Sequence, residues 1–201
     1  MDTRKITADN NQLSADLDAA SRRVGLRVFV LGAAIQTIAV YLFCLGIFSY
    51  TSYSRAQFRG DVWSFEDWKT ELGDQLVLWV AIGLGGLALA VASMPAGHWA
   101  GKMIGIRKYR FVWVGPVAAF FPTLVGGLTI TLAAFAYRSA INHYGIGSFL
   151  EDFVIPTVLF ALGFYLPGIV TSLLGGLVIR QKMRGKTEDF EREMAHQQQQ
   201  E

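Results

Sequence analysis

Four long stretches of the chain contain no Asp, Glu, Lys or Arg. They cover residues 28–50, 75–97, 111–137 and 153–179. A helix rises about 1.5 Å per residue, so about 20 apolar residues cross the roughly 30 Å hydrocarbon core of a bilayer. Strands of a membrane β-barrel alternate in polarity, whereas these runs are continuous. The pattern predicts an all-α, multi-pass membrane protein built as a bundle of four transmembrane helices.

The basic residues indicate how the chain is oriented. Of the 18 Lys and Arg residues, those between the first and second spans or between the third and fourth are Arg55, Arg59, Lys69 and Arg138. The positive-inside rule therefore predicts that both termini and the segment between the second and third spans are cytoplasmic. The external segments lack an Asn-x-Ser/Thr site, which favours a bacterial cytoplasmic (inner) membrane.

This topology divides the chain into three predicted regions: a cytoplasmic N-terminal segment (1–27), a transmembrane domain (28–179) with an external loop (51–74), and a cytoplasmic basic and Gln-rich tail (180–201). Apolar residues at helical spacing, from Leu13 through Leu17 and Val24, predict a helix that runs directly into the first span. The polar run at 197–200 is predicted to be disordered.

The external loop contains an aromatic segment, Trp63 to Trp68, with the features of a helix start. Ser64 is placed to cap the helix, and Asp67 stands three residues later. We expect a short amphipathic helix that ends near Gly73. Trp63 and Trp68 are interpreted either as anchors at the membrane interface or as a docking surface for another subunit.

The segment between the third and fourth spans has a second predicted helix start. Ser148 and Glu151 have the spacing of a capping box that begins the fourth helix. His143, in the same segment, has no Cys or His companion nearby, so a solvated loop histidine is the favoured interpretation over a metal ligand.

Small residues recur at four-residue steps in the third and fourth spans. The candidate helix-packing residues are Gly115, Ala119, Thr123, Gly127, Gly168, Ser172 and Gly176. Small residues at this spacing let two helix backbones approach closely in lipid. The pattern predicts tight packing between the third and fourth helices, and a seam between subunits is the alternative.

Pro122 and Pro167 lie at similar depths near the centre of the predicted third and fourth spans. Proline removes a backbone hydrogen bond and bends a helix, so each is a candidate kink. A kink that only shapes the helix packing is one interpretation. A pair of broken helices that forms a transport site is the other.

Basic residues crowd the predicted cytoplasmic ends of the third and fourth spans. The candidate lipid-headgroup residues are Arg107, Lys108, Arg110, Arg180, Lys182 and Arg184. Such clusters fix topology, and they attract anionic lipid headgroups.

The spans lack charged residues and paired histidines, and no phosphate-binding glycine loop occurs. We therefore predict no catalytic residue, no metal ligand and no cofactor. The expected function is that of a non-enzymatic accessory or scaffolding subunit of a membrane complex. Its partners are membrane lipids and other membrane subunits or a second copy, with no nucleic acid. A channel or transporter component that uses the proline-broken helices is the alternative, and an enzyme that uses His98 and His143 is a weaker one.

Overall fold

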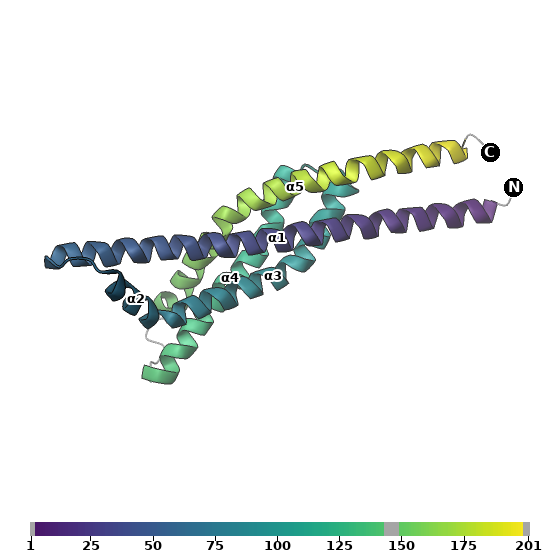
Figure 1. Cartoon of the computed structure of the whole chain (residues 1–201). Helices are drawn as coiled ribbons and strands as arrows, with labels where there is room; N and C mark the ends of the chain where they lie inside the picture. The colour runs from purple at the N-terminus through teal and green to yellow at the C-terminus, as the bar shows by residue number, and fades with distance from the viewer. Residues whose placement is uncertain (1–2, 143–148, 199–201) are drawn as a thin grey trace. The chain divides into compact units, whose positions relative to one another are not determined.

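The computed structural model describes residues 3–142 and 149–198, and these residues are helical apart from short turns (Figure 1). In chain order the elements are α1 (Thr3–Arg59), α2 (Phe65–Asp74), α3 (Leu76–Gly105), α4 (Phe111–Asn142), the π-helical turn η1 (Leu150–Val154) and α5 (Ile155–Gln198). The prediction of an all-helical protein is confirmed for this part of the chain.

Four helical segments are long and apolar enough to cross a membrane. They are Ser14–Arg59, Leu76–Gly105, Phe111–Ala140 and Leu150–Lys186. Many of their large apolar side chains are exposed: Leu31 is 64% exposed, Leu42 63% and Leu166 66%. Long helices with apolar outer surfaces are what a lipid environment requires, because the backbone bonds are satisfied internally while the side chains face hydrocarbon.

The helices continue well beyond the charge-free stretches of the sequence. The predicted helix before the first span is present and continuous with it, and α1 also continues through the start of the predicted external loop to Arg59. α3 extends past residue 97 to Gly105. A helix supplies its own backbone hydrogen bonds, so it need not stop where charged residues begin.

The C-terminal tail is also helical, because α5 runs to Gln198. The prediction of disorder is therefore wrong for Gln197 and Gln198. A favourable pair at i and i+4 supports this extension: Arg184 Nε donates to Glu188 Oε1 at 2.9 Å.

Gly60 ends α1 and turns the chain toward α2. Its φ of +76° is in the left-handed region that glycine adopts without steric cost. The Gly60 amide donates to the Gln57 carbonyl, and the Asp61 amide donates to the Ala56 carbonyl. These two bonds form a Schellman motif, which satisfies carbonyl groups at the helix end.

α2 begins at the predicted cap, since the Ser64 side chain accepts a hydrogen bond from the Glu66 amide at 3.2 Å. The other predicted cap involves Ser148, which, like His143, lies outside the described residues. The described chain resumes at Phe149 and enters the π-helical turn η1, after which the Ile155 amide donates to the Leu150 carbonyl. Pro156 follows, and the wider turn accommodates a residue that has no amide hydrogen.

The helices form two compact units, and each contains parts of α1, α3, α4 and α5, with α2 and η1 in the second. The first unit comprises residues 1–32, 91–121 and 168–201, and the second comprises residues 33–90 and 122–167. The core of the first contains Phe29, Ala100, Ile104, Val114, Ala118, Ile179 and Met183. The core of the second contains Ala33, Val40, Ala81, Ile82, Leu89, Ile130 and Phe164.

Candidate functional site

In the first unit, two glycines bring α4 and α5 into close contact. A methyl group on Gly115 would stand 2.8 Å from the Ser172 carbonyl oxygen. One on Gly176 would stand 2.9 Å from Phe111 Cβ. Contacts of this length leave no room for a side chain, so glycine is required for the two helices to pack as they do.

In the second unit, the same two helices meet around Gly127. A methyl group on Gly127 would stand 2.7 Å from the Ala161 amide nitrogen and 2.8 Å from the Thr157 carbonyl oxygen. Close by, Thr157 Oγ1 donates to Thr131 Oγ1 at 3.1 Å. A side-chain hydrogen bond between helices supplements the van der Waals contact in lipid.

The remaining small residues of the predicted set are buried on α4 or lie in α5, where hydroxyl groups bond within the helix. Ala119 and Thr123 are buried on α4. On α5, the Ser172 hydroxyl donates to the Ile169 carbonyl and the Thr171 hydroxyl donates to the Gly168 carbonyl. Both of these bonds stay within α5.

Sequence reasoning missed a contact between α1 and α3 in the first unit. The backbone of Gly25 lies against Gly97 and Gly101, and Gly101 also lies against the Ser21 carbonyl. The signal was the spacing of Gly97, Gly101 and Gly105, but the last two lie beyond the charge-free stretch at 75–97. Small residues four apart allow the same close packing there as inside the span.

An ion-pair group adjoins that contact. Asp18 on α1 pairs with Arg22 at 2.6 Å and with Lys102 of α3 at 3.8 Å. The three side chains are partly exposed, so the pairs contribute less to stability than the apposed backbones do.

Pro122 and Pro167 lie inside α4 and α5, which continue through them. The boundaries of the two units also fall here: the first unit ends at Phe121 and resumes at Gly168, on either side of the proline-bearing segment. The kinks expected at these prolines remain a prediction.

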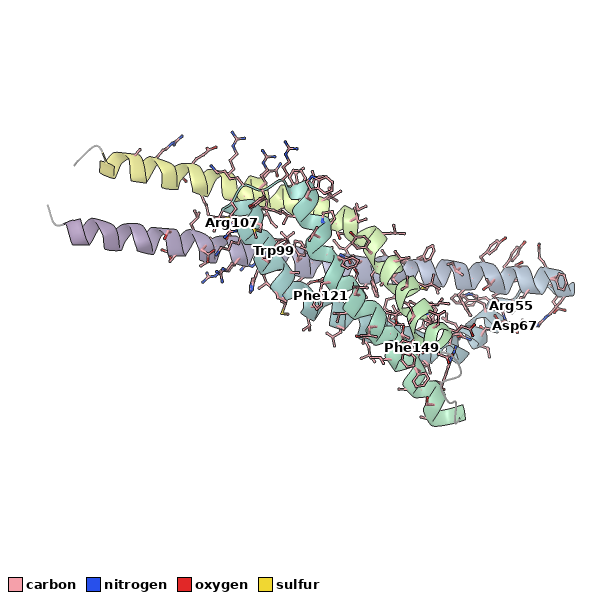
Figure 2. All side chains as sticks on the ribbon, turned by 180° about the vertical axis from the view of Figure 1, so that it is seen from behind. Arg55, Asp67, Trp99, Arg107, Phe121 and Phe149 are labelled. Atoms are coloured by element: carbon pink, nitrogen blue, oxygen red, sulfur yellow. The ribbon has the colours of Figure 1, made fainter. Side chains whose placement is uncertain are left out.

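In the second unit, α2 is fastened to the end of α1 (Figure 2). Trp68 Nε1 donates to Ser49 Oγ at 3.1 Å, and Arg55 pairs with Glu71 at 3.9 Å. Trp68 also stacks on Phe65, with ring centroids 5.3 Å apart. The hydrogen bond to Ser49 and the ion pair with Arg55 join α2 to α1.

Trp63, the other predicted aromatic anchor, lies edge-on to Tyr53 with ring centroids 6.5 Å apart. Beside it the apolar side chains face outward: Phe58 is 95% exposed and Val62 is 92% exposed. The end of α1 and the start of α2 therefore carry an outward-facing apolar surface, here called the corner surface and made of Phe58, Val62, Trp63 and Phe65.

In the first unit, the structure gathers basic residues around a pocket of about 810 Å³. The cationic side chains that line it come from the turn between α3 and α4 and from α5, and they are Lys108, Arg110, Arg180 and Arg184. Its apolar lining includes Ile104, Phe111, Leu177 and Met183. We call this feature the basic pocket. Its volume is within the range of about 300–1,000 Å³ that is usual for ligand sites.

Two glycine contacts involve residues that line the basic pocket. A methyl group on Gly105 of α3 would stand 3.0 Å from Met183 Cγ on α5, and Gly176 lies against Phe111. Met183 is 1% exposed and Ile104 is 3% exposed, so the apolar wall is well packed. The cationic residues thus lie on or next to helices that are in close contact with one another.

Lys108 adopts an unusual backbone conformation. Its φ is +55°, and it is the one non-glycine residue with positive φ in the described chain. The turn lets the Tyr109 amide donate to the Met103 carbonyl at 3.0 Å. A side chain in this region costs roughly 1 to 2 kcal/mol relative to glycine. The chain therefore carries a charged side chain at a position where glycine is favoured sterically.

One carboxylate also lines the basic pocket. Glu188 accepts from Arg184, and this hydrogen bond and the Arg184 charge, together with Arg192 and Lys108, lower the pKa of Glu188 below its ordinary value. The carboxylate neutralises part of the positive charge, and the pocket keeps an excess of cations.

Two of the predicted headgroup residues do not line the basic pocket. Arg107 and Lys182 are exposed beside it, each one residue from a lining residue. Figure 2 shows Arg107 at the turn between α3 and α4. The six residues predicted from charge alone therefore divide into four that share one cavity and two that face outward.

Within the described residues, no group of three or more His, Cys, Asp and Glu side chains is arranged to hold a metal ion. Comparison with protein-family models, curated proteins and solved structures gives no match. The structure thus defines a class by architecture: an all-helical chain with four helices able to cross a membrane and a basic pocket at one end of three of them.

Proposed function

We propose that the protein is a non-enzymatic accessory or scaffolding subunit of a larger integral membrane complex. In this proposal both termini are cytoplasmic and the membrane is a bacterial cytoplasmic membrane. The predicted topology then places the corner surface outside the first span, on the external side.

The corner surface is the observation that carries the proposal. Phe58 and Val62 are almost fully exposed, and they lie beyond the predicted end of the first span at residue 50. The Trp68–Ser49 hydrogen bond and the Arg55–Glu71 ion pair join α2 to α1 next to this surface in the sequence. Exposed apolar surface of this kind marks protein–protein or membrane interaction sites, and we assign this one to a protein partner.

The test is purification of the tagged chain from its native membrane in mild detergent, followed by mass spectrometry of the retained proteins. A subunit retained in fixed stoichiometry is expected. Phe58→Ser with Val62→Ser should release it. The matched control is Leu31→Ser with Leu42→Ser, which lowers the apolarity of exposed positions on the same helix inside the predicted span.

Release by both pairs, or retention of no subunit at all, contradicts the proposal. If the corner surface is an anchor in the membrane interface, the Phe58 and Val62 variant should instead weaken membrane anchoring without releasing a protein.

A channel or transporter component is the second candidate. The observation that favours it is the coincidence of Pro122 and Pro167 with the boundaries of the two compact units. Helices interrupted at one depth supply backbone carbonyl groups to a permeation site in several transporters. Measurement of ion flux in liposomes separates this candidate from the first.

A further inference from the structure

We propose that the basic pocket binds an anionic phospholipid whose headgroup carries at least two negative charges. This inference does not depend on a partner subunit, so it stands or fails separately from the scaffolding function.

The charge of the basic pocket favours a doubly charged headgroup. Its lining carries four cationic side chains, from two separate segments, and the single carboxylate of Glu188. Arg180 and Arg184 are one helical turn apart on α5. They share the pocket with Lys108 and Arg110, which lie in the connection between α3 and α4. Several cations that line one cavity suit a ligand with more than one anionic group.

The apolar part of the basic pocket favours a lipid over a soluble anion. Phe111 is the first residue of the third predicted span, and Leu177 lies near the end of the fourth. In the predicted topology the cations lie at the cytoplasmic headgroup level, and these apolar residues continue toward the acyl chains. Basic pockets between membrane helices on this side are typical sites for phosphate-rich lipid headgroups.

The conformation of Lys108 supports the same assignment. A glycine at φ +55° would relieve the backbone, yet it would remove a cation from the pocket rim. The strained position thus adds a positive charge where the headgroup is proposed to bind, as is common for strained residues at ligand sites.

The experiment is native mass spectrometry of the purified chain titrated with cardiolipin, which carries two phosphates, and with phosphatidylcholine as the zwitterionic reference. We expect selective cardiolipin binding. The variant Arg110→Gln with Arg180→Gln should weaken cardiolipin binding roughly tenfold or more, because it removes two of the four cations that line the pocket and would contact the headgroup. The control, Arg107→Gln with Lys182→Gln, makes the same charge change outside the pocket and should change binding less than twofold.

Glu188→Gln should change cardiolipin binding in the opposite direction. It removes the carboxylate that accepts from Arg184, so cardiolipin binding should strengthen severalfold. A gain of binding cannot come from misfolding, which makes this variant a safeguard for the loss seen in the arginine pair.

Three results would overturn the proposal. One is equal weakening by the two arginine-containing pairs, which indicates diffuse attraction to any basic surface. Another is equal affinity for cardiolipin and phosphatidylcholine. The third is inorganic pyrophosphate binding as tightly as cardiolipin and competing with it, which assigns the basic pocket to a soluble phosphate compound.

Discussion

The backbone of Gly127 on α4 lies directly against that of Ala161 on α5, with 2.7 Å between the Ala161 amide nitrogen and the place where a side chain at 127 would begin. Gly127→Ala should therefore push the two helices apart and lower the free energy of unfolding by about 1–3 kcal/mol. Unfolding in detergent, followed by circular dichroism, measures the change.

Gly163→Ala is the matched control, because a methyl group there meets nothing within 4 Å. It should be neutral or slightly stabilising, since alanine favours the helix over glycine by up to about 1 kcal/mol. Equal stabilities of the two variants would show that α4 and α5 are not in contact at this level.

A second prediction concerns the fastening of α2. Trp68→Phe keeps an aromatic ring for Phe65 and Phe48 but removes the donor to Ser49. Combined with Ser49→Ala in a double-mutant cycle, it should reveal a coupling of about 0.5–1.5 kcal/mol in the free energy of unfolding. Thr70→Ala is the control partner, since its hydroxyl bonds within α2 to Glu66. A coupling no larger with Ser49 than with Thr70 contradicts the observed bond.

Orientation in the membrane is a third prediction, and it follows from the basic residues. In a Cys44→Ala background, Arg59→Cys should react with an impermeant thiol reagent added outside intact cells. Lys186→Cys should react only after the membrane is opened. Labelling of position 186 from outside would reverse the proposed topology.

Flux through the protein separates the two functional candidates. For a scaffolding subunit we expect purified wild-type protein in liposomes to pass no ions, and Pro122→Ala to alter only stability or assembly, because it restores one backbone hydrogen bond. A current that depends on Pro122 would instead support carbonyl groups at a permeation site. The control is Pro95→Ala, which removes a proline from inside another helix, α3, and should leave the flux unchanged.

The ion pair at the tail has a defined pH dependence. Arg184 lowers the pKa of Glu188 below its ordinary value of 4.5, so the pair stabilises the folded state above that value. The contribution is lost as the pH falls through the lowered pKa. NMR titration of Glu188 should show the depressed pKa, and Arg184→Gln should return it toward the ordinary value. An unchanged pKa in this variant would assign the effect to other cations.

The helical class and the four long apolar helices could be predicted because helices of soluble proteins are rarely free of charge over more than 20 residues. The start of α2 was also readable, since Ser64 is a local signal that needs no tertiary partner. Helix ends were harder to predict. α3 continues past His98 and Lys102 because a polar helix end costs little, and charge alone does not mark where hydrogen bonding stops.

The candidate site shows where sequence reasoning ends. Charge identified Arg107 and Lys108 alike, yet one faces outward and the other lines the basic pocket. Lys108 also has a φ of +55°, a backbone conformation that the presence of a lysine does not indicate. The contact of Gly25 with Gly101 could not be predicted either. It joins two helices, and the spacing of glycines alone does not specify which helices pair.

That contact between Gly25 and Gly101 has a consequence for the order of events during synthesis. Both partners, and the Asp18–Lys102 pair beside them, belong to residues 1–105, so the pairing needs nothing that the ribosome makes later. At about 5–20 residues per second, residues 106–201 take roughly 5–20 s more to be made. α1 and α3 can therefore associate as a hairpin during translation, and α4 and α5 then join a pair of helices that is already assembled.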